Sequence, residues 1–147
     1  MSNIVVTGGS GFIGSHIIKS LEKENHNVYN IDRKKFPGKE NIDIDINDLN
    51  NLKKFFIDKK IDFVFHIAAI ANARKSIEDT IETVDINIKG TANVLEASHQ
   101  AKVKKVILAS TVWVFNACKD DENTKNKITL NEKSKLNPEG GGHFYTT

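Results

Sequence analysis

Short apolar runs and amphipathic stretches alternate along this chain. The strand-like segments lie at residues 4–6, 27–31, 42–44, 63–67 and 106–109. Between them, apolar residues recur at spacings of three and four, which is the period of a helix with one buried face. These helical patterns cover residues 12–24, 49–56 and 81–95. Such alternation predicts parallel strands joined by helical crossovers.

The pattern therefore predicts an α/β fold of the Rossmann type, a doubly wound parallel sheet with helices on both faces. Numbering the strands along the chain, we expect the order 3-2-1-4-5. Asn47 or Asp48 can cap the helix that follows them. The 147 residues fit a single domain, 1–147. Residues 119–135 are charged, rich in Asn and without periodicity, so we expect a solvated loop there.

Composition narrows the classes of function. Hydrophobic residues make up 39% of the chain and charged residues 27%, and the net charge of +2 predicts neither a nucleic-acid nor a membrane partner. The single cysteine, Cys118, excludes an intrachain disulfide and fits a reducing compartment such as the cytoplasm. The apolar start is interpreted as a buried strand rather than a signal peptide. Five scattered histidines predict no metal site.

The strongest local signal is a glycine turn directly after the first strand. Gly8, Gly11 and Gly14 follow one another at three-residue spacing, and a helical pattern begins at once. A helix N-terminus offers unpaired N–H groups and partial positive charge, which suit a pyrophosphate. Glycine leaves room for that ligand to approach the backbone. Strand, glycine turn and helix in this order predict a dinucleotide site.

Asp32, at the end of the second strand, favours one cofactor over another. A carboxylate there accepts hydrogen bonds from an adenosine ribose diol and repels a 2′-phosphate, which favours NAD over NADP. The basic neighbours Arg33, Lys34 and Lys35 leave NADP open as the less favoured cofactor. An ordinary turn aspartate is the simpler alternative for Asp32.

Several segments together resemble one family. Residues 7–14 are similar to the T-G-G-x-G-F-I-G fingerprint of extended short-chain dehydrogenases/reductases, within which the NAD-dependent epimerase/dehydratase group, typified by UDP-glucose 4-epimerase, is most similar. Residues 45–46, 66–69, 85–91 and 109–115 resemble further motifs of that group, in the same order. The resemblance covers only the N-terminal part of such enzymes, whose chains are roughly twice as long.

The resemblance implies contacts with NAD beyond the glycine turn. Asp45 and Ile46 would contact the adenine, and the small Ala68 and Ala69 would let the cofactor approach the backbone. Asn87 would support the geometry of the site, whereas His66 is interpreted as a core histidine. The simpler alternatives are a helix cap at Asp45, tight packing of the alanines and a ligand-independent hydrogen bond at Asn87. The expected cofactor-binding residues are Gly8, Gly11, Phe12, Ile13, Gly14, Asp32, Arg33, Asp45, Ile46, Ala68, Ala69, Asn87 and Ala109.

The same resemblance implies two catalytic residues, Thr111 and Tyr145. Tyr145 as phenolate would take the proton of a sugar hydroxyl with help from the Thr111 hydroxyl, while hydride passes to the nicotinamide and later returns to the other face. The family's lysine would be residue 149, beyond these 147 residues. The family's Tyr-Gly reads Phe115-Asn116 here, which alters packing rather than the catalytic tyrosine.

The sequence thus predicts the NAD-binding half of a nucleotide-sugar epimerase, truncated before the sixth strand and the substrate domain. Without that lysine, these residues alone are expected to be inactive. The alternatives are a non-catalytic NAD(P)-binding module or regulator, or a nucleotide-sugar reductase or dehydratase. A 4,6-dehydratase is disfavoured because residues 111–113 read Thr-Val-Trp where those enzymes resemble T-D-E. A nucleotide-sugar substrate and a homodimer are compatible with the resemblance, and apolar surface should be exposed.

Overall fold

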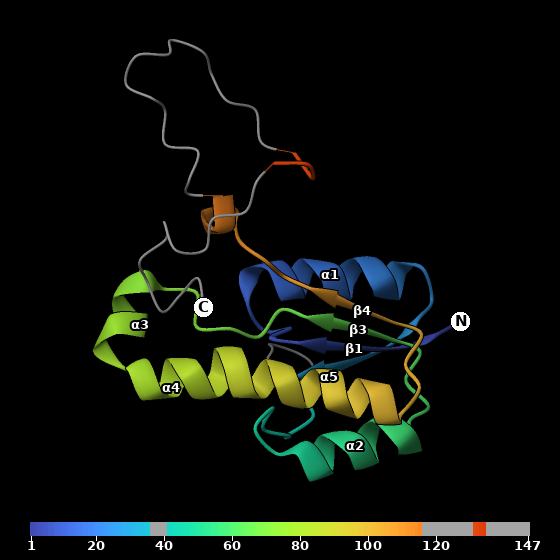
Figure 1. The fold of residues 1–147 in the computed structure, drawn as a ribbon. Helices are drawn as coiled ribbons and strands as arrows, with labels where there is room; N and C mark the ends of the chain where they lie inside the picture. Colours follow the sequence, from blue (N-terminus) through green and yellow to red (C-terminus); the bar gives the residue numbers. More distant parts are fainter. Residues whose placement is uncertain (36–40, 116–130, 135–147) are drawn as a thin grey trace.

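The fold is a parallel four-stranded sheet with helices on both faces (Figure 1). A computed structural model describes residues 1–35, 41–115 and 131–134. Cys118, Tyr145 and most of the loop expected at 119–135 lie outside these described residues. The arrangement confirms the predicted Rossmann-like α/β class.

Strands and helices alternate along the chain as the apolar pattern predicts. The strands are β1 (Asn3–Thr7), β2 (Asn27–Ile31), β3 (Phe63–His66) and β4 (Lys105–Leu108). The α-helices are α1 (Phe12–Lys23), α2 (Leu49–Asp58), α3 (Ala73–Glu78), α4 (Thr80–Val84) and α5 (Thr91–Gln100). A π-helix, η1 (Asp85–Gly90), joins α4 to α5, and a 3-10 helix, η2 (Val112–Phe115), follows β4.

The strands run in the order β2-β1-β3-β4, and all pairs are parallel. The strand expected at 42–44 is reduced to one parallel bridge between Ile42 and Ile31. That bridge lies beside β2, where the order 3-2-1-4-5 places a third strand. The chain turns at once, since the Ile44 N–H donates to the Ile42 carbonyl (2.9 Å), so no longer ladder forms.

Helices α1, α2 and the run from α4 to α5 follow the predicted amphipathic segments, whereas the short helix α3 was not predicted. Asp48 rather than Asn47 caps α2, because its carboxylate accepts the Asn51 N–H at 3.0 Å. The long helix expected over 81–95 is a continuous rod from α4 to α5, but its middle turn is the π-helix η1 (Figure 1). None of the helices within the described ranges has the length and apolar character needed to span a bilayer.

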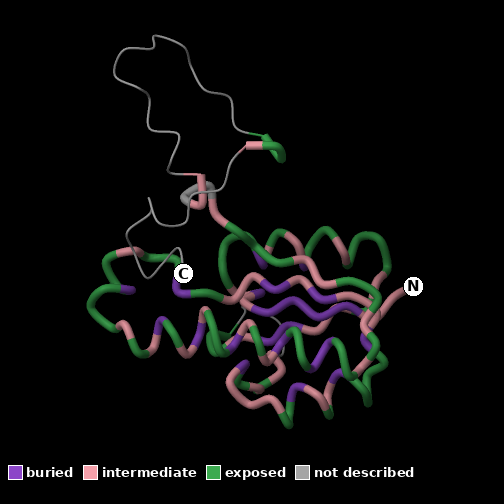
Figure 2. The backbone as a smooth tube through the Cα atoms, viewed as in Figure 1, coloured by how far each residue is buried: buried purple, intermediate pink, exposed green. Residues whose placement is uncertain are grey.

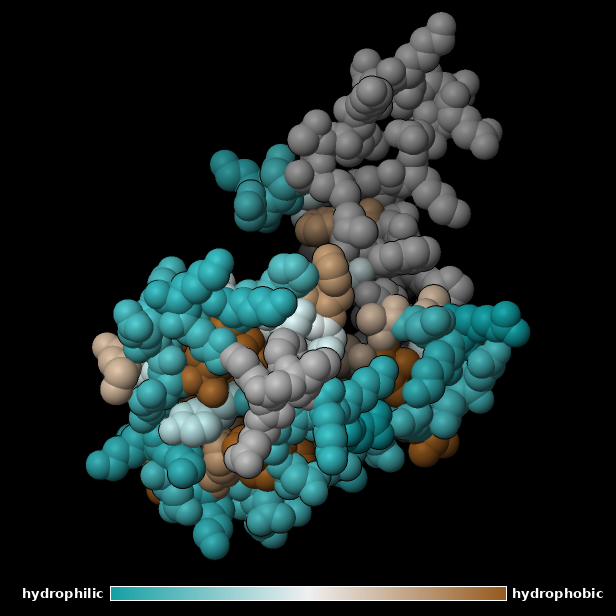
Figure 3. Space-filling model, turned by 180° about the vertical axis from the view of Figure 1, so that it is seen from behind, coloured by the Kyte–Doolittle hydropathy of each residue, from teal (hydrophilic) through white to brown (hydrophobic). Residues whose placement is uncertain are grey.

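The core lies around the two central strands. Helix α1 covers one face of the sheet, and α2 and α5 pack together on the other (Figure 1). Buried positions concentrate in the strands and on the helix faces turned toward them (Figure 2). Val5, Val64, Leu52, Phe56 and Val94 have no exposed surface. The surface seen from behind is mostly hydrophilic, with apolar side chains visible in places (Figure 3).

Strand β3 is less enclosed than its apolar run suggests. Val64 and His66 are buried, whereas Phe63 and Phe65 on the opposite face are half-buried. The reason is that α1 lies chiefly over β1 and β2. Strand β4, at the edge of the described sheet, contains no fully buried residue.

Candidate functional site

A cavity of about 640 Å³ lies at the carboxyl ends of the strands. In open parallel sheets this is the edge where ligands bind. The cavity is lined by the turn between β1 and α1, the end of β2, residues 44–46 and the segment after β3. It brings together all the expected cofactor-binding residues except Asn87 and Ala109.

Two glycines of the turn are required by the fold itself. Gly8 has a φ of +72°, and a Cβ there would lie 2.6 Å from the Ala68 nitrogen. A Cβ on Gly14 would overlap the carbonyl oxygen of Gly8. The Gly11 N–H donates to that same carbonyl (3.1 Å) and closes the turn. Larger residues at Gly8 or Gly14 would therefore separate β1, β3 and α1.

Gly11 has a different role, because it is exposed and lines the cavity. Its backbone (φ −77°, ψ 176°) is open to other residues, and a Cβ would meet only the Gly8 carbonyl oxygen, at 3.3 Å. As the N-cap of α1 it supplies no side-chain hydrogen bond. Within the described part of the chain, the N–H groups of Phe12, Ile13 and Gly14 have no recorded partner. These groups can bind an anion in the cavity.

Asp32 stands at the end of β2 and connects two loops. Its Oδ2 accepts the Ser10 N–H (2.9 Å) and its Oδ1 accepts the Lys34 N–H (2.7 Å). The Ser10 hydroxyl in turn donates to the Lys34 carbonyl (2.6 Å). Each carboxylate oxygen can accept a further hydrogen bond. Asp32 can therefore fix the glycine turn and still accept hydrogen bonds from a ligand's hydroxyl groups.

Asn30 is a supporting residue that the sequence analysis missed. It is buried in β2, and its Nδ2 donates to the Ser10 hydroxyl (3.1 Å) and to Asn41 Oδ1 (2.8 Å). Its Oδ1 lies where a Cβ of Gly9 would stand, which explains the second glycine of the turn. A polar residue between the apolar Tyr29 and Ile31 of the predicted strand was the signal that could have identified it.

Asn87 shapes the site without lining the cavity. Its Oδ1 accepts the Ile70 N–H (2.8 Å), and its Nδ2 donates to the Ile70 carbonyl (3.2 Å). Ile70 itself lines the cavity, as do Ala68 and Ala69. Asn87 therefore holds the segment after β3 in place, which fits a positioning role rather than direct contact with a ligand.

His66 belongs to the core. It is 2% exposed; its Nδ1 lies 2.7 Å from the Thr7 hydroxyl and its Nε2 lies 2.9 Å from the Thr91 hydroxyl. Burial lowers the pKa of this imidazole to about 4, so it is neutral near pH 7. This agrees with its interpretation as a core histidine.

The remaining expected residues lie apart from the cavity or outside the described residues. Ala109 follows β4, where its N–H donates to the His66 carbonyl (3.1 Å), and neither it nor the half-buried Thr111 lines the cavity. Tyr145 is outside the described residues, so its pairing with Thr111 stays a prediction. Asp45 does line the cavity, and its Oδ1 accepts the Asn47 N–H (2.8 Å). The residues that the structure describes contain no cluster of three possible metal ligands.

Comparison with known proteins identifies the family of this chain. The model of the NAD dependent epimerase/dehydratase family matches residues 4–138. A putative UDP-glucose 4-epimerase of Methanocaldococcus jannaschii is 38% identical, over 74% of this chain and 37% of its own length. Protein CapI of Staphylococcus aureus is 32% identical, over 97% of this chain and 49% of its own length.

The solved structures show the same fold. MoeE5, in complex with UDP-glucose and NAD, matches with a TM-score of 0.79 at 30% identity, over 98% of this chain and 44% of its own. Curated relatives include both UDP-glucose 4-epimerases and dTDP-D-glucose 4,6-dehydratases. This chain spans about half, or less, of the length of the curated relatives it matches. The chain belongs to the NAD-dependent epimerase/dehydratase family.

Proposed function

We propose that this chain is the NAD-binding part of a nucleotide-sugar epimerase of the UDP-glucose 4-epimerase kind. The observation that carries the proposal is that the N–H groups at the start of α1 and the Asp32 carboxylate belong to residues that line the same cavity. Those groups suit a pyrophosphate next to a ribose diol. The glycines leave room for such a ligand, and MoeE5, a similar structure, is in complex with UDP-glucose and NAD.

Each part of the cavity has a role in this proposal. The amides of Phe12, Ile13 and Gly14 bind the pyrophosphate, and Asp32 accepts hydrogen bonds from the adenosine ribose. Residues 45–46 contact the adenine, while Ala68 and Ala69 keep the site open. When bound, NAD supplies reversible acceptance of a hydride. Thr111 and Tyr145 hold and move the proton of the sugar hydroxyl.

These 147 residues alone are expected to bind NAD without turning over a sugar. A free tyrosine has a pKa near 10 and is protonated at neutral pH, and the lysine that activates it in the resembled family would be residue 149, outside these 147 residues. A nucleotide-sugar substrate, a homodimer and a cytoplasmic location remain predictions. A binding module without turnover is the competing function.

The decisive experiment is calorimetric titration of the chain with NAD and with NADP. We expect NAD to bind more tightly, and Gly11→Ala to weaken NAD binding by about tenfold or more, because the added methyl group stands where the pyrophosphate approaches. The variant should fold, since the Gly11 backbone is open to alanine. Ser20→Ala, at an exposed position of α1, is the control and should bind normally.

Two outcomes would contradict the proposal. Failure of the wild-type chain to bind either nucleotide removes the cofactor site. Unchanged NAD affinity in Gly11→Ala would show that NAD does not bind at the glycine turn. Assay of UDP-galactose conversion on the same homogeneous sample tests the second expectation, because measurable turnover would show that these residues suffice for catalysis.

A further inference from the structure

Three charged side chains form an ion triad beside the cavity. Glu82 lies on α4. Its Oε1 is 3.1 Å from Arg33 Nη1, and its Oε2 is 3.3 Å from Lys75 Nζ. Arg33 and Lys75 both line the cavity, whereas Glu82 does not. One carboxylate behind the cavity therefore engages two cations of its wall.

The position of Arg33 connects this triad with the choice between NAD and NADP. Arg33 directly follows Asp32, the residue proposed to accept hydrogen bonds from the adenosine ribose. In Rossmann sheets, an arginine near this acid accommodates the 2′-phosphate of NADP. Here the Arg33 guanidinium already has a carboxylate partner, so a phosphate must compete with Glu82 for it.

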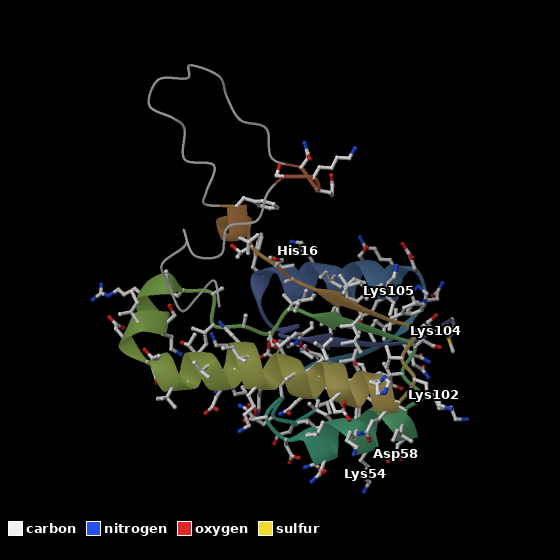
Figure 4. The ribbon with its side chains drawn as sticks, in the orientation of Figure 1. His16, Lys54, Asp58, Lys102, Lys104 and Lys105 are labelled. Carbon is white, nitrogen blue, oxygen red and sulfur yellow. The ribbon has the colours of Figure 1, made fainter. Side chains whose placement is uncertain are left out.

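Three lysines of the described chain lie far from the cavity. Lys102, Lys104 and Lys105 lie around the amino-terminal end of β4, at the opposite end of the sheet from the cavity (Figure 4). Lys104 is also paired with Asp62 (2.8 Å). Among the described residues that line the cavity, the basic side chains are those of Arg33, Lys34 and Lys75.

We propose that Glu82 is a specificity-determining residue that favours NAD over NADP by holding Arg33 and Lys75 in the ion triad. This inference rests on the proposed function, because it requires the cavity to bind a dinucleotide. Glu82 acts in two ways: it occupies the guanidinium that would bind the 2′-phosphate, and its negative charge opposes that phosphate. Loss of the carboxylate leaves two cations free at the cavity wall.

The Glu82→Gln substitution separates this role from folding. Lys75 and Arg33 hold the pKa of the Glu82 carboxyl below its usual value, so the group is ionised at neutral pH and the substitution removes a full charge. The side chains of Arg33 and Lys75 are 58% and 53% exposed, and ion pairs this exposed add little to stability. The Glu82 N–H keeps its own partner, Asp79 Oδ1 (3.0 Å).

The test is titration of the wild-type chain and Glu82→Gln with NAD and NADP by calorimetry at fixed salt. We expect the ratio of the two affinities to move toward NADP by about tenfold, the size of one charge-assisted hydrogen bond, with NAD affinity little changed. Glu78→Gln is the matched control. It removes the same charge, but Glu78 pairs with Arg74 (2.8 Å), which does not line the cavity as Arg33 and Lys75 do. The affinity ratio of this variant should therefore stay at the wild-type value.

A double variant assigns the effect to Arg33. Glu82→Gln with Arg33→Gln should lose most of the gain in NADP affinity. An unchanged ratio in Glu82→Gln, an equal shift in Glu78→Gln, or a gain that survives removal of Arg33 would each overturn the inference. NAD binding without a shift in ratio refutes only the role of Glu82, whereas a wild-type chain that binds neither nucleotide refutes the proposed function as well.

Discussion

At the scale of single residues, His66 shows how burial determines the state of a histidine close to a ligand cavity. The ring joins β3 to β1 through the Thr7 hydroxyl and to α5 through the Thr91 hydroxyl. With 2% of its surface exposed, the charged form would lose nearly all of its hydration. The folded chain therefore holds this imidazole neutral well below the pH at which an unfolded one is protonated.

This burial makes stability depend on pH. Because the folded pKa is about 4 and the ordinary value is 6.5, the unfolded state binds a proton first as the pH falls. The contribution of His66 is complete above about pH 6.5 and is lost as the pH falls toward 4. We expect this loss to lower the free energy of unfolding by about 2 kcal/mol when the pH falls from 7.5 to 5.

Urea unfolding at the two pH values measures this loss. His66→Gln keeps polar atoms between the two threonines but has no group that titrates in this range. The variant should therefore show a pH-dependent loss smaller by about 2 kcal/mol, whatever its absolute stability. Equal losses in the two proteins would show that His66 is protonated equally in both states.

The glycine turn marks how far sequence alone identifies such residues. Spacing predicted Gly8, Gly11 and Gly14 as one phosphate-binding set, and all three line the cavity. Spacing could not distinguish the roles of the three glycines. Gly8 is constrained by the backbone of Ala68, and Gly14 is constrained by the carbonyl group of Gly8. The same holds for Asn30, whose importance depends on Ser10 and Asn41 folding beside it.

At the scale of elements, η1 is the feature that determines the shape of the segment after β3. This π-turn contains Asn87, which forms two hydrogen bonds with the Ile70 backbone. It also contains Gly90, where a Cβ would lie 2.6 Å from Ile46 Cδ1. Since Ile46 and Ile70 both line the cavity, one short stretch of helix positions two of its walls.

We expect Asn87→Ala to destabilise the chain and to weaken NAD binding together. The substitution leaves the N–H and carbonyl of Ile70 without these partners, which costs about 1–3 kcal/mol, partly offset by the better helix propensity of alanine. Urea unfolding and NAD titration measure the two effects. Asn50→Ala, at an exposed position of α2, should change neither, and an Asn87→Ala variant with wild-type stability would contradict the role of this contact.

The elements were predictable where they depend on their own residues. Helices α1 and α2, the central strands and the parallel order follow from apolar periodicity and the Asp48 cap. The π-turn does not, because positions 81–95 fit an ordinary helical period equally well. The strand expected at 42–44 is a single bridge for a similar reason. Its apolar residues do not predict the turn between Ile42 and Ile44 that ends the pairing with β2.

At the scale of the whole molecule, the rod formed by α4, η1 and α5 presents apolar side chains to solvent. Ile81, Val84, Ile88 and Leu95, here called the α4–α5 stripe, are 37–74% exposed and recur at spacings of three, four and seven along the rod. Exposed apolar surface was expected from the sequence, and this stripe is one such region. Exposed apolar side chains of this size favour association.

We expect the chain to self-associate through this stripe. The double variant Ile81→Lys with Leu95→Lys should lower the association constant at least about tenfold, because it removes two large apolar contacts and adds repelling charges. Sedimentation velocity over a range of concentrations measures this as a smaller rise in sedimentation coefficient. Ile57→Lys, equally apolar and 52% exposed but on α2, should associate as the wild type does. If Ile57→Lys weakens association as much as the double variant, general surface apolarity rather than the α4–α5 stripe drives it.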